Sequence, residues 1–198
     1  KARVCHQVIH SHCSGTPLNA DIKENVYKLL FMDVGMAAYL TGLDWKAIQA
    51  LDGNALVNEG KLAEQFIGQH LMYPLEPPRL TYWLREGKSS NAEVDFAIAV
   101  ANQIIPIEVK AGKSGALKSL QQFVLKKNAA LCIRFDLNRP SIQEVTHALK
   151  TATGSASVTF TLLSLPLYLV EELSGVIDQI RNTQLLKNTA RQNYVNVH

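Results

Sequence analysis

Short apolar runs separated by turn residues recur along most of the chain and predict a series of β-strands. In residues 2–11, Val4, Val8 and Ile9 alternate loosely with polar positions, and alternating β-branched residues are typical of a strand. The other apolar runs of strand length are Val26–Met32, Leu80–Leu84, Ala92–Val100, Gln103–Ala111, Ala129–Phe135 and Val158–Leu163. Together these runs predict a central β-sheet.

Two of these runs form a predicted β-hairpin. Ala92–Val100 and Gln103–Ala111 are separated only by Ala101-Asn102, a spacing that is typical of a tight turn. Pro106 lies inside the second run, and a residue without a backbone N–H removes one donor from the ladder between strands. We therefore expect this strand to lie at an edge of the sheet or to carry a bulge at Pro106.

Apolar residues at helical spacing predict helices between the strands. The clearest helix spans residues 58–72, where Leu62, Phe66, Ile67 and Leu71 fall on one face and prolines follow. The other predicted helices span Val34–Leu40 with Asp33 as N-cap, Asp44–Leu51, Ala116–Lys127, Pro140–Lys150 and Pro166–Ile180. Strands that alternate with helices in this way predict an α/β fold, a mixed central β-sheet flanked by helices.

Composition and length set the class of protein. The 198 residues are 47% hydrophobic, which is enough for a sizeable core, and the net charge of +3 is far below that of a histone-like protein. Three cysteines, Cys5, Cys13 and Cys132, cannot all pair within one chain, so we expect free thiols and a cytoplasmic location. No apolar run approaches the roughly 20 residues that span a bilayer, so no membrane partner is expected.

We divide the chain into three parts. Residues 1–57 form an N-terminal strand and helix extension packed on the core, residues 58–181 form the main domain, and residues 182–198 form a polar tail. Because the first residue is Lys1 instead of methionine, we expect this sequence to be a piece of a longer polypeptide.

Acidic side chains gather on one face of the predicted hairpin. Side chains alternate across a strand, so Glu93 and Asp95 share one face. In the partner strand, Glu108 and Lys110 share a face as well. The opposite face of the first strand would then carry Val94, Phe96, Ile98 and Val100. The pairing of the two strands thus brings carboxylates together.

Carboxylates crowded in a partly buried place repel one another and need a counter-charge, which Mg²⁺ or Mn²⁺ supplies. Asp95, Glu108 and the main-chain carbonyl of Val109 are predicted ligands, and Glu64 of the helix at residues 58–72 is predicted to act as an outer or water-mediated ligand. Lys110 adds a fixed positive charge beside a phosphate. Such a set suits phosphodiester hydrolysis. The alternative is a cross-strand ladder of salt bridges without a metal.

A second possible ligand cluster lies near the N-terminus, at Cys5, His6, His10, His12 and Cys13. Its spacing matches no familiar zinc pattern, and a strand would divide these side chains between two faces. We therefore favour ordinary surface or half-buried side chains here.

A local basic strip borders the acidic residues. Lysines follow the hairpin with few acids between them, and the candidates for contacts with a DNA backbone are Arg85, Lys88, Lys113 and Lys118. The alternative is a solvated helix face. Tyr82 and Trp83 are candidates for stacking on bases, but alternation sends one of them inward, and we expect Trp83 in the core.

Five ordered segments carry a family resemblance: Phe31–Gly35, Glu59–Gly68, Tyr82–Glu86, Ala92–Phe96 and Pro106–Gly112. They resemble the C-terminal domain of unknown function attached to many prokaryotic AAA-type ATPases. That domain is similar to the PD-(D/E)XK nuclease superfamily, which implies a restriction-endonuclease-like core at residues 58–181 with Mg²⁺ or Mn²⁺ as cofactor.

The resemblance implies roles for particular residues. The acidic helix residue of the superfamily falls on Glu64, its Asp on Asp95, and its Glu and Lys on Glu108 and Lys110, whereas Val94 stands where the motif has proline. No GxxxxGK[ST] motif occurs in the chain. The expected partner is therefore an upstream ATPase domain of the same polypeptide.

Two functions from different classes remain open at this stage. The first is a metal-dependent nuclease-like domain that hydrolyses phosphodiester bonds of DNA. The second is a non-catalytic module that binds DNA or a protein and regulates the upstream ATPase, with the acids in a salt-bridge network. A dimerisation domain, and with it a homo-oligomer, is the third option.

Overall fold

The structure is a computed structural model, and it describes residues 4–43, 46, 59–75, 78–87, 92–112, 115–151 and 154–183. The helix predicted at Asp44–Leu51 lies almost entirely outside these ranges, as do Lys88, Lys113 and most of the predicted tail. No helix among the described residues is long and apolar enough to cross a membrane.

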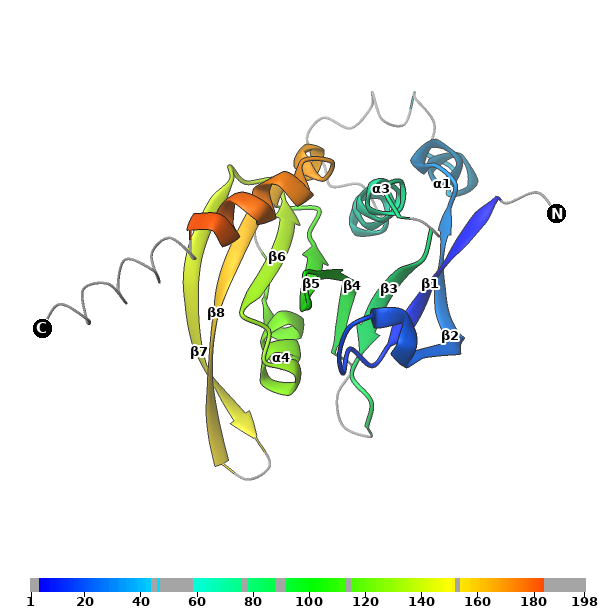
Figure 1. The fold of residues 1–198 in the computed structure, drawn as a ribbon. Coiled ribbons are helices and arrows are strands. Elements are labelled where there is room, and N and C mark those ends of the chain that lie inside the picture. The colour runs from blue at the N-terminus through cyan, green and yellow to red at the C-terminus, as the bar shows by residue number, and fades with distance from the viewer. Residues whose placement is uncertain are drawn as a thin grey trace, which may run out of the picture.

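A mixed eight-stranded sheet forms the centre of the molecule, in the order β2-β1-β3-β4-β5-β6-β8-β7 (Figure 1). The pairs β1/β3, β5/β6 and β6/β8 are parallel, and the other neighbours are antiparallel. The strands are β1 (Cys5–Ser11), β2 (Ile22–Phe31), β3 (Leu80–Leu84), β4 (Glu93–Val100), β5 (Gln103–Val109), β6 (Leu131–Asp136), β7 (Ser141–Thr151) and β8 (Gly154–Pro166). The predicted α/β class, a mixed sheet flanked by helices, is confirmed. The N-terminal strand is part of this sheet because β1 pairs with both β2 and β3.

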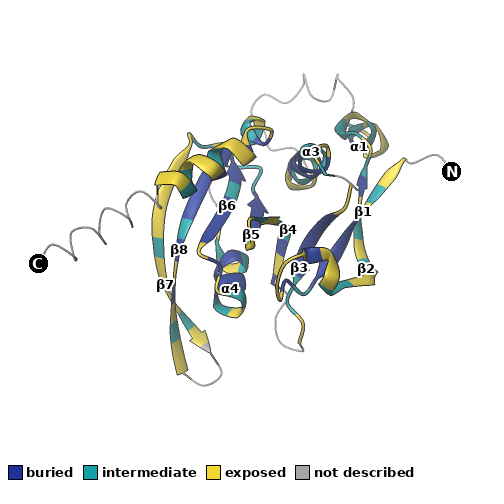
Figure 2. Cartoon of the chain, in the orientation of Figure 1, coloured by how far each residue is buried: buried dark blue, intermediate teal, exposed yellow. Residues whose placement is uncertain are grey.

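Helices cover both faces of the sheet (Figure 1). One face packs against α3 (Glu59–Met72) and the helix at residues 173–183, and α1 (Val34–Leu40) lies beside α3. The other face packs against α4 (Lys118–Lys127). Figure 2 shows that the buried residues are concentrated on the strands between these helices, whereas the long β7/β8 hairpin is largely exposed at its far end.

Local sequence signals account for α1 and α4. Asp33 caps α1 as predicted, because its Oδ1 accepts a hydrogen bond from the backbone N–H of Met36 at 2.8 Å. The predicted apolar stripe of α4 is buried, with Leu120 and Phe123 fully inside, and Asn128 ends the helix in the left-handed conformation at φ 55°. These signals are confined to the helix and its caps, so the sequence alone was sufficient to predict them.

The predicted helix at Pro140–Lys150 is wrong. Residues 141–151 form β7, which pairs with β8 over its whole length from Ser141↔Ser164 to Thr151↔Gly154. Val145 and Leu149 are four residues apart, which also fits a helix, but both pack as alternate positions of a strand. The long antiparallel pairing therefore overrides the local pattern.

The expectation that Pro106 lies at an edge or a bulge is also wrong. The strand β5 lies between β4 and β6, and Pro106 pairs with Ala97 without a shift of register. Pairing with β6 begins at Ile107. The missing N–H of Pro106 therefore falls before the first rung of that ladder, and a proline is tolerated there in a central strand.

A β-bulge in β4 changes the predicted arrangement of faces. The register against β3 shifts between Thr81↔Ala97 and Trp83↔Val94, so β4 contains one extra residue at Asp95 and Phe96. Val94 consequently packs on the α4 side, whereas Phe96 packs on the α3 side. The prediction that Val94, Phe96, Ile98 and Val100 share one face is wrong for Val94.

Tyr82 and Trp83 both lie in the core, at 6% and 4% exposure. Alternation does send them to opposite faces, but helices cover both faces of the sheet. Trp83 is buried as expected, packed edge-on against Phe123. Stacking of Tyr82 on a base is therefore wrong for this conformation of the chain.

Candidate functional site

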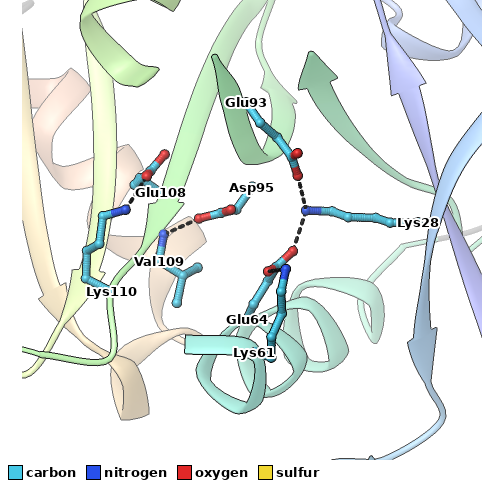
Figure 3. Close-up of polar contacts among 8 residues, drawn as sticks. All are labelled: Lys28, Lys61, Glu64, Glu93, Asp95, Glu108, Val109 and Lys110. Carbon is cyan, nitrogen blue, oxygen red and sulfur yellow. Dashed lines mark hydrogen bonds and ion pairs between the residues drawn. The ribbon is translucent and has the colours of Figure 1, made fainter. Parts of the chain in front are cut away.

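Three carboxylates meet at the bulge in β4. Glu93 and Asp95 come from β4 and Glu64 from α3, and one oxygen from each lies within 4.8 Å of the others. The bulge matters because it turns Asp95 toward the same side of the sheet as Phe96, which is the side that α3 covers. Close packing of α3 on this side brings Glu64 to the strand (Figure 3).

The close packing of α3 depends on Gly68. A Cβ atom built at Gly68 would lie 2.7 Å from Cζ of Phe96 and would also overlap the side chain of Leu30. Any larger residue at this position would push α3 away from the sheet. Gly68 thereby controls how near Glu64 comes to Asp95.

The neighbouring strand β5 supplies the second half of the cluster. The backbone N–H of Val109 donates to Oδ2 of Asp95 at 2.7 Å, which fixes the orientation of that carboxylate. Lys110 pairs with Oε1 of Glu108 (Figure 3). Glu108 is only 5% exposed, and its Oε2 is buried without a hydrogen-bond partner.

The cluster also contains a lysine that the sequence analysis missed. Lys28 of β2 pairs with Oε1 of Glu64 and lies 3.2 Å from Oε1 of Glu93 (Figure 3). Its Nζ also lies 5.1 Å and 5.0 Å from the ring centroids of Tyr82 and Phe96. A signal was present in the sequence: Lys28 occupies the same alternating positions as Val26 and Leu30, which face the core.

Burial and mutual repulsion perturb two of the acids. Burial, followed by the charge of Glu64, raises the pKa of Asp95 to about 6 in spite of Lys28. Burial, followed by the charge of Asp95, raises the pKa of Glu108 to about 7, although Lys110 acts in the opposite direction. For Lys28, burial would lower the pKa, but the surrounding carboxylates outweigh it and raise the pKa, so Lys28 stays charged.

The donor set fits a hard divalent cation. All the side-chain atoms that could bind a metal are carboxylate oxygens, which Mg²⁺ and Mn²⁺ prefer as ligands. One of them, the buried Oε2 of Glu108, accepts no hydrogen bond. Burial, with repulsion between the carboxylates, keeps the pKa values of Asp95 and Glu108 raised, although Lys28 and Lys110 act in the opposite direction. Buried carboxylates with raised pKa values in one cluster are typical of functional sites.

The structure brings Glu64 and Asp95 together and places Glu108 beside them, just outside the closest group of carboxylates. Glu64 and Asp95 meet as predicted, with Glu93 as an additional member of the group. Glu108 adjoins Asp95 but lies outside the group whose oxygens are all within 4.8 Å. The role of Val109 as a carbonyl ligand stays a prediction, since its recorded contact with Asp95 uses the N–H.

Two of the predicted phosphate contacts line one pocket. Arg85 and Lys118 lie along a pocket of about 330 Å³ between α4 and β7, together with Gln121 and His147. Nη1 of Arg85 donates to Gln122 at 2.9 Å, and Lys118 is exposed at the beginning of α4. Ala92 also lines this pocket, and it packs with the residues of α4, so the pocket lies on the face of the sheet opposite α3 and Glu64.

The histidines near the N-terminus meet a different acid. His10, His12 and Glu86 have potential ligand atoms within 4.8 Å of one another. However, Nδ1 of His10 accepts the backbone N–H of Leu84 at 3.3 Å, so the proton of a neutral ring is on Nε2. That tautomer opposes metal binding through Nε2. The expectation of surface or half-buried side chains is confirmed for Cys5, His6 and His12, and it is wrong for His10 and Cys13, which are 1% and 2% exposed. The three cysteines are free thiols as expected.

Residues 59–153 match the family described as a domain of unknown function (DUF4143). The predicted resemblance to a domain of unknown function is confirmed over this segment. It includes Glu64, Glu93, Asp95 and Glu108, whereas Lys28 lies outside it. Neither the curated proteins nor the solved structures give a match. The relationship to the PD-(D/E)XK superfamily stays a prediction.

Proposed function

We propose that the chain binds Mg²⁺ or Mn²⁺ at the acidic cluster and hydrolyses phosphodiester bonds of DNA, as the C-terminal part of a larger ATPase. The observation that carries this proposal is the convergence of Glu64, Glu93 and Asp95 beside Glu108, whose buried Oε2 has no donor. Burying several carboxylates with incomplete compensation costs stability, and a binding function explains why a protein would retain them.

Asp95 and Glu108 are the residues that would hold the cation, with the carbonyl of Val109 as a third ligand and Glu64 acting through a water. When bound, a divalent cation supplies a Lewis acid that neutralises charge developing on a phosphodiester. Asp95 is oriented for this role by the N–H of Val109. Lys110, held beside Glu108, offers a positive charge to a phosphate oxygen.

The pocket lined by Arg85 and Lys118 supports a nucleic-acid substrate. Both side chains are positively charged, and Gln121 of α4 and His147 of β7 add further hydrogen-bonding groups to the same pocket. Contacts of this kind bind the phosphate backbone regardless of base sequence. We therefore propose backbone binding without base recognition.

The direct test is a nicking assay on plasmid DNA during a Mg²⁺ or Mn²⁺ titration. The wild-type chain should cut DNA in the presence of the metal, Lys110→Ala should lose at least a hundredfold in rate, and Asp95→Asn should lose cutting and metal uptake. Lys126→Ala is the matched control, since Lys126 is an exposed lysine of α4. If the wild-type chain neither cuts DNA nor takes up metal in calorimetry, the proposal is wrong.

One observation favours the non-catalytic alternative. Lys28 bridges Glu64 and Glu93, and Lys110 pairs with Glu108, so part of the cluster is a network of ion pairs. A module of this kind would bind DNA or a protein partner equally well with and without Mg²⁺. Binding to labelled DNA in the presence of excess chelator or of Mg²⁺ separates the two functions, and size-exclusion chromatography tests the dimerisation option.

A further inference from the structure

We propose that Lys28 is a built-in cation that fills one of two cation positions in the acidic cluster, so that the site binds one divalent ion instead of two. This inference rests on the proposed metal-binding function. It concerns a residue that lies outside the matched family segment and that reaches the cluster from a distant strand of the sheet.

The surroundings of Lys28 form a cage for a single positive charge. Its Nζ pairs with Glu64 and lies 3.2 Å from Glu93. The ring centroids of Tyr82 and Phe96 lie 5.1 Å and 5.0 Å from Nζ, within the distance of cation–π attraction. Only 20% of the side chain is exposed, so carboxylates and aromatic rings have replaced most of the water around this ammonium group.

The position of Lys28 is one that a second metal ion would need. In two-metal phosphodiesterase sites the ions lie about 3.5–4 Å apart and share carboxylates. The oxygens of Glu64, Glu93 and Asp95 lie within 4.8 Å of one another, close enough to contact one ion together, so these three acids form one cation position. Lys28 already neutralises the Glu64 and Glu93 side of this group.

A free ion does not easily displace this lysine. Lys28 is carried by β2, whose pairing with β1 includes Lys28↔Val8, so the ammonium group is tethered to a strand instead of a loop. Mg²⁺ gives up its water shell reluctantly, and two walls of the cage are aromatic rings that cannot serve as ligands. The ammonium group of Lys28 is therefore favoured over a free Mg²⁺ ion at this position.

The second cation position of the cluster lies between Asp95 and Glu108, away from Lys28. In the described part of the chain, Lys28 makes no hydrogen bond to Asp95 or Glu108. Oε2 of Glu108 is still without a donor. One divalent ion can therefore bind at Asp95 and Glu108 while Lys28 stays in place.

The test counts the ions that the protein binds. Mn²⁺ is titrated into the metal-free chain, and the bound fraction is measured by electron paramagnetic resonance and by calorimetry. The wild-type chain should bind one Mn²⁺ and Lys28→Met should bind two, because the pair of carboxylates that loses its lysine takes a second ion. Lys28→Arg keeps the charge and should bind one. Lys61→Met is the matched control, since Lys61 also lies 3.3 Å from Glu64 but is 79% exposed.

Each outcome bears on a different claim. If the wild-type chain binds one ion and Lys28→Met also binds one, the inference about Lys28 is wrong while the proposed metal site stands. Two ions in the wild-type chain would refute it equally. If neither chain binds an ion, the proposed function fails and the inference fails with it. An ion bound by Lys28→Met alone would mean that Lys28 blocks the site, which contradicts both proposals.

A second variant covers the case in which Lys28→Met does not fold. Glu93→Gln removes one carboxylate from the cage but leaves Asp95 and Glu108 intact, and Glu93 is 44% exposed, so the fold should tolerate the change. The affinity of Glu93→Gln for Mn²⁺ should then stay within about threefold of the wild-type affinity. Any larger loss would mean that the ion binds among Glu64, Glu93 and Asp95 in place of Lys28, and would overturn the inference.

Discussion

Replacing Asp95 by asparagine should stabilise the metal-free protein while it abolishes metal binding. The substitution keeps an oxygen that can accept the N–H of Val109, which now bonds Oδ2 of Asp95 at 2.7 Å. It removes the negative charge that burial and Glu64 make unfavourable. The variant thus separates the charge of Asp95 from its hydrogen bond.

The size of the effect follows from the raised pKa of Asp95. The pKa increases from 3.8 to about 6 on folding, and each pH unit corresponds to about 1.4 kcal/mol. Folded Asp95 holds its proton more tightly than the unfolded chain does, so the protein loses stability as the pH rises from about 4 to 6, and the full cost of about 3 kcal/mol applies above pH 6. Asp95→Asn should recover about 2–3 kcal/mol at pH 8.

Urea denaturation at pH 8 with a chelator, and again at about pH 3, measures this effect. The gain of Asp95→Asn should be present at pH 8 and should almost vanish at about pH 3, where Asp95 is protonated in both states. With Mg²⁺ at a hundred times its dissociation constant, the wild-type protein should gain about 2.7 kcal/mol and the variant nothing.

The matched control is Glu144→Gln on β7, an exposed acid that should change stability by less than about 0.5 kcal/mol. If Asp95→Asn is less stable than the wild-type protein at pH 8 without metal, Asp95 is a structural partner in a salt-bridge network. Asp95 would then not be a ligand of a metal site.

Three further predictions concern packing, DNA binding and pH. Gly68→Ala should destabilise the fold by about 1–3 kcal/mol, because the new Cβ would overlap Phe96. Gly60→Ala on the same helix is the control, because its Cβ would meet nothing within 4 Å. Equal thermal stabilities of the two variants would contradict the close packing of α3. Lys118→Gln should weaken DNA binding and lower the slope of log affinity against log salt by about 1, measured by fluorescence anisotropy, and an unchanged slope would exclude a phosphate contact. Burial, with the nearby charge of His12, lowers the pKa of His10; the protein should therefore lose stability as the pH falls below 6.5, and His10→Gln should lose less in urea unfolding at pH 5.5. Equal losses in both proteins would exclude His10 as the cause.

Elements whose signals lie within a few residues could be predicted from the sequence. The helix α3 follows from its apolar stripe, the hairpin β4/β5 from the two residues Ala101 and Asn102 between its strands, and the cap of α1 from Asp33. Both turn residues of the hairpin adopt positive φ angles, 42° and 64°, as a tight hairpin turn requires. In these cases the backbone needs no information from distant parts of the chain.

Elements whose form depends on a distant partner could not be predicted in this way. The segment Ser141–Thr151 has a pattern that fits either a helix or a strand, and its pairing with β8 decides for the strand. The bulge in β4 depends on the register of β3, and it moved Val94 to the opposite face. Both outcomes rest on hydrogen bonds between strands, which leave no local mark in the sequence.

For the candidate site, the sequence by itself determined which carboxylates and which lysine of β5 are available, because Asp95, Glu108 and Lys110 follow from alternation along two neighbouring strands. Only the tertiary structure decided that the predicted Glu64 comes within 4.8 Å of both Glu93 and Asp95, and that Lys28, 36 residues before Glu64, lies between Glu64 and Glu93. The physical reason is that charges interact through space, so the partner of a buried acid is set by how helix and sheet pack and is independent of the distance along the chain.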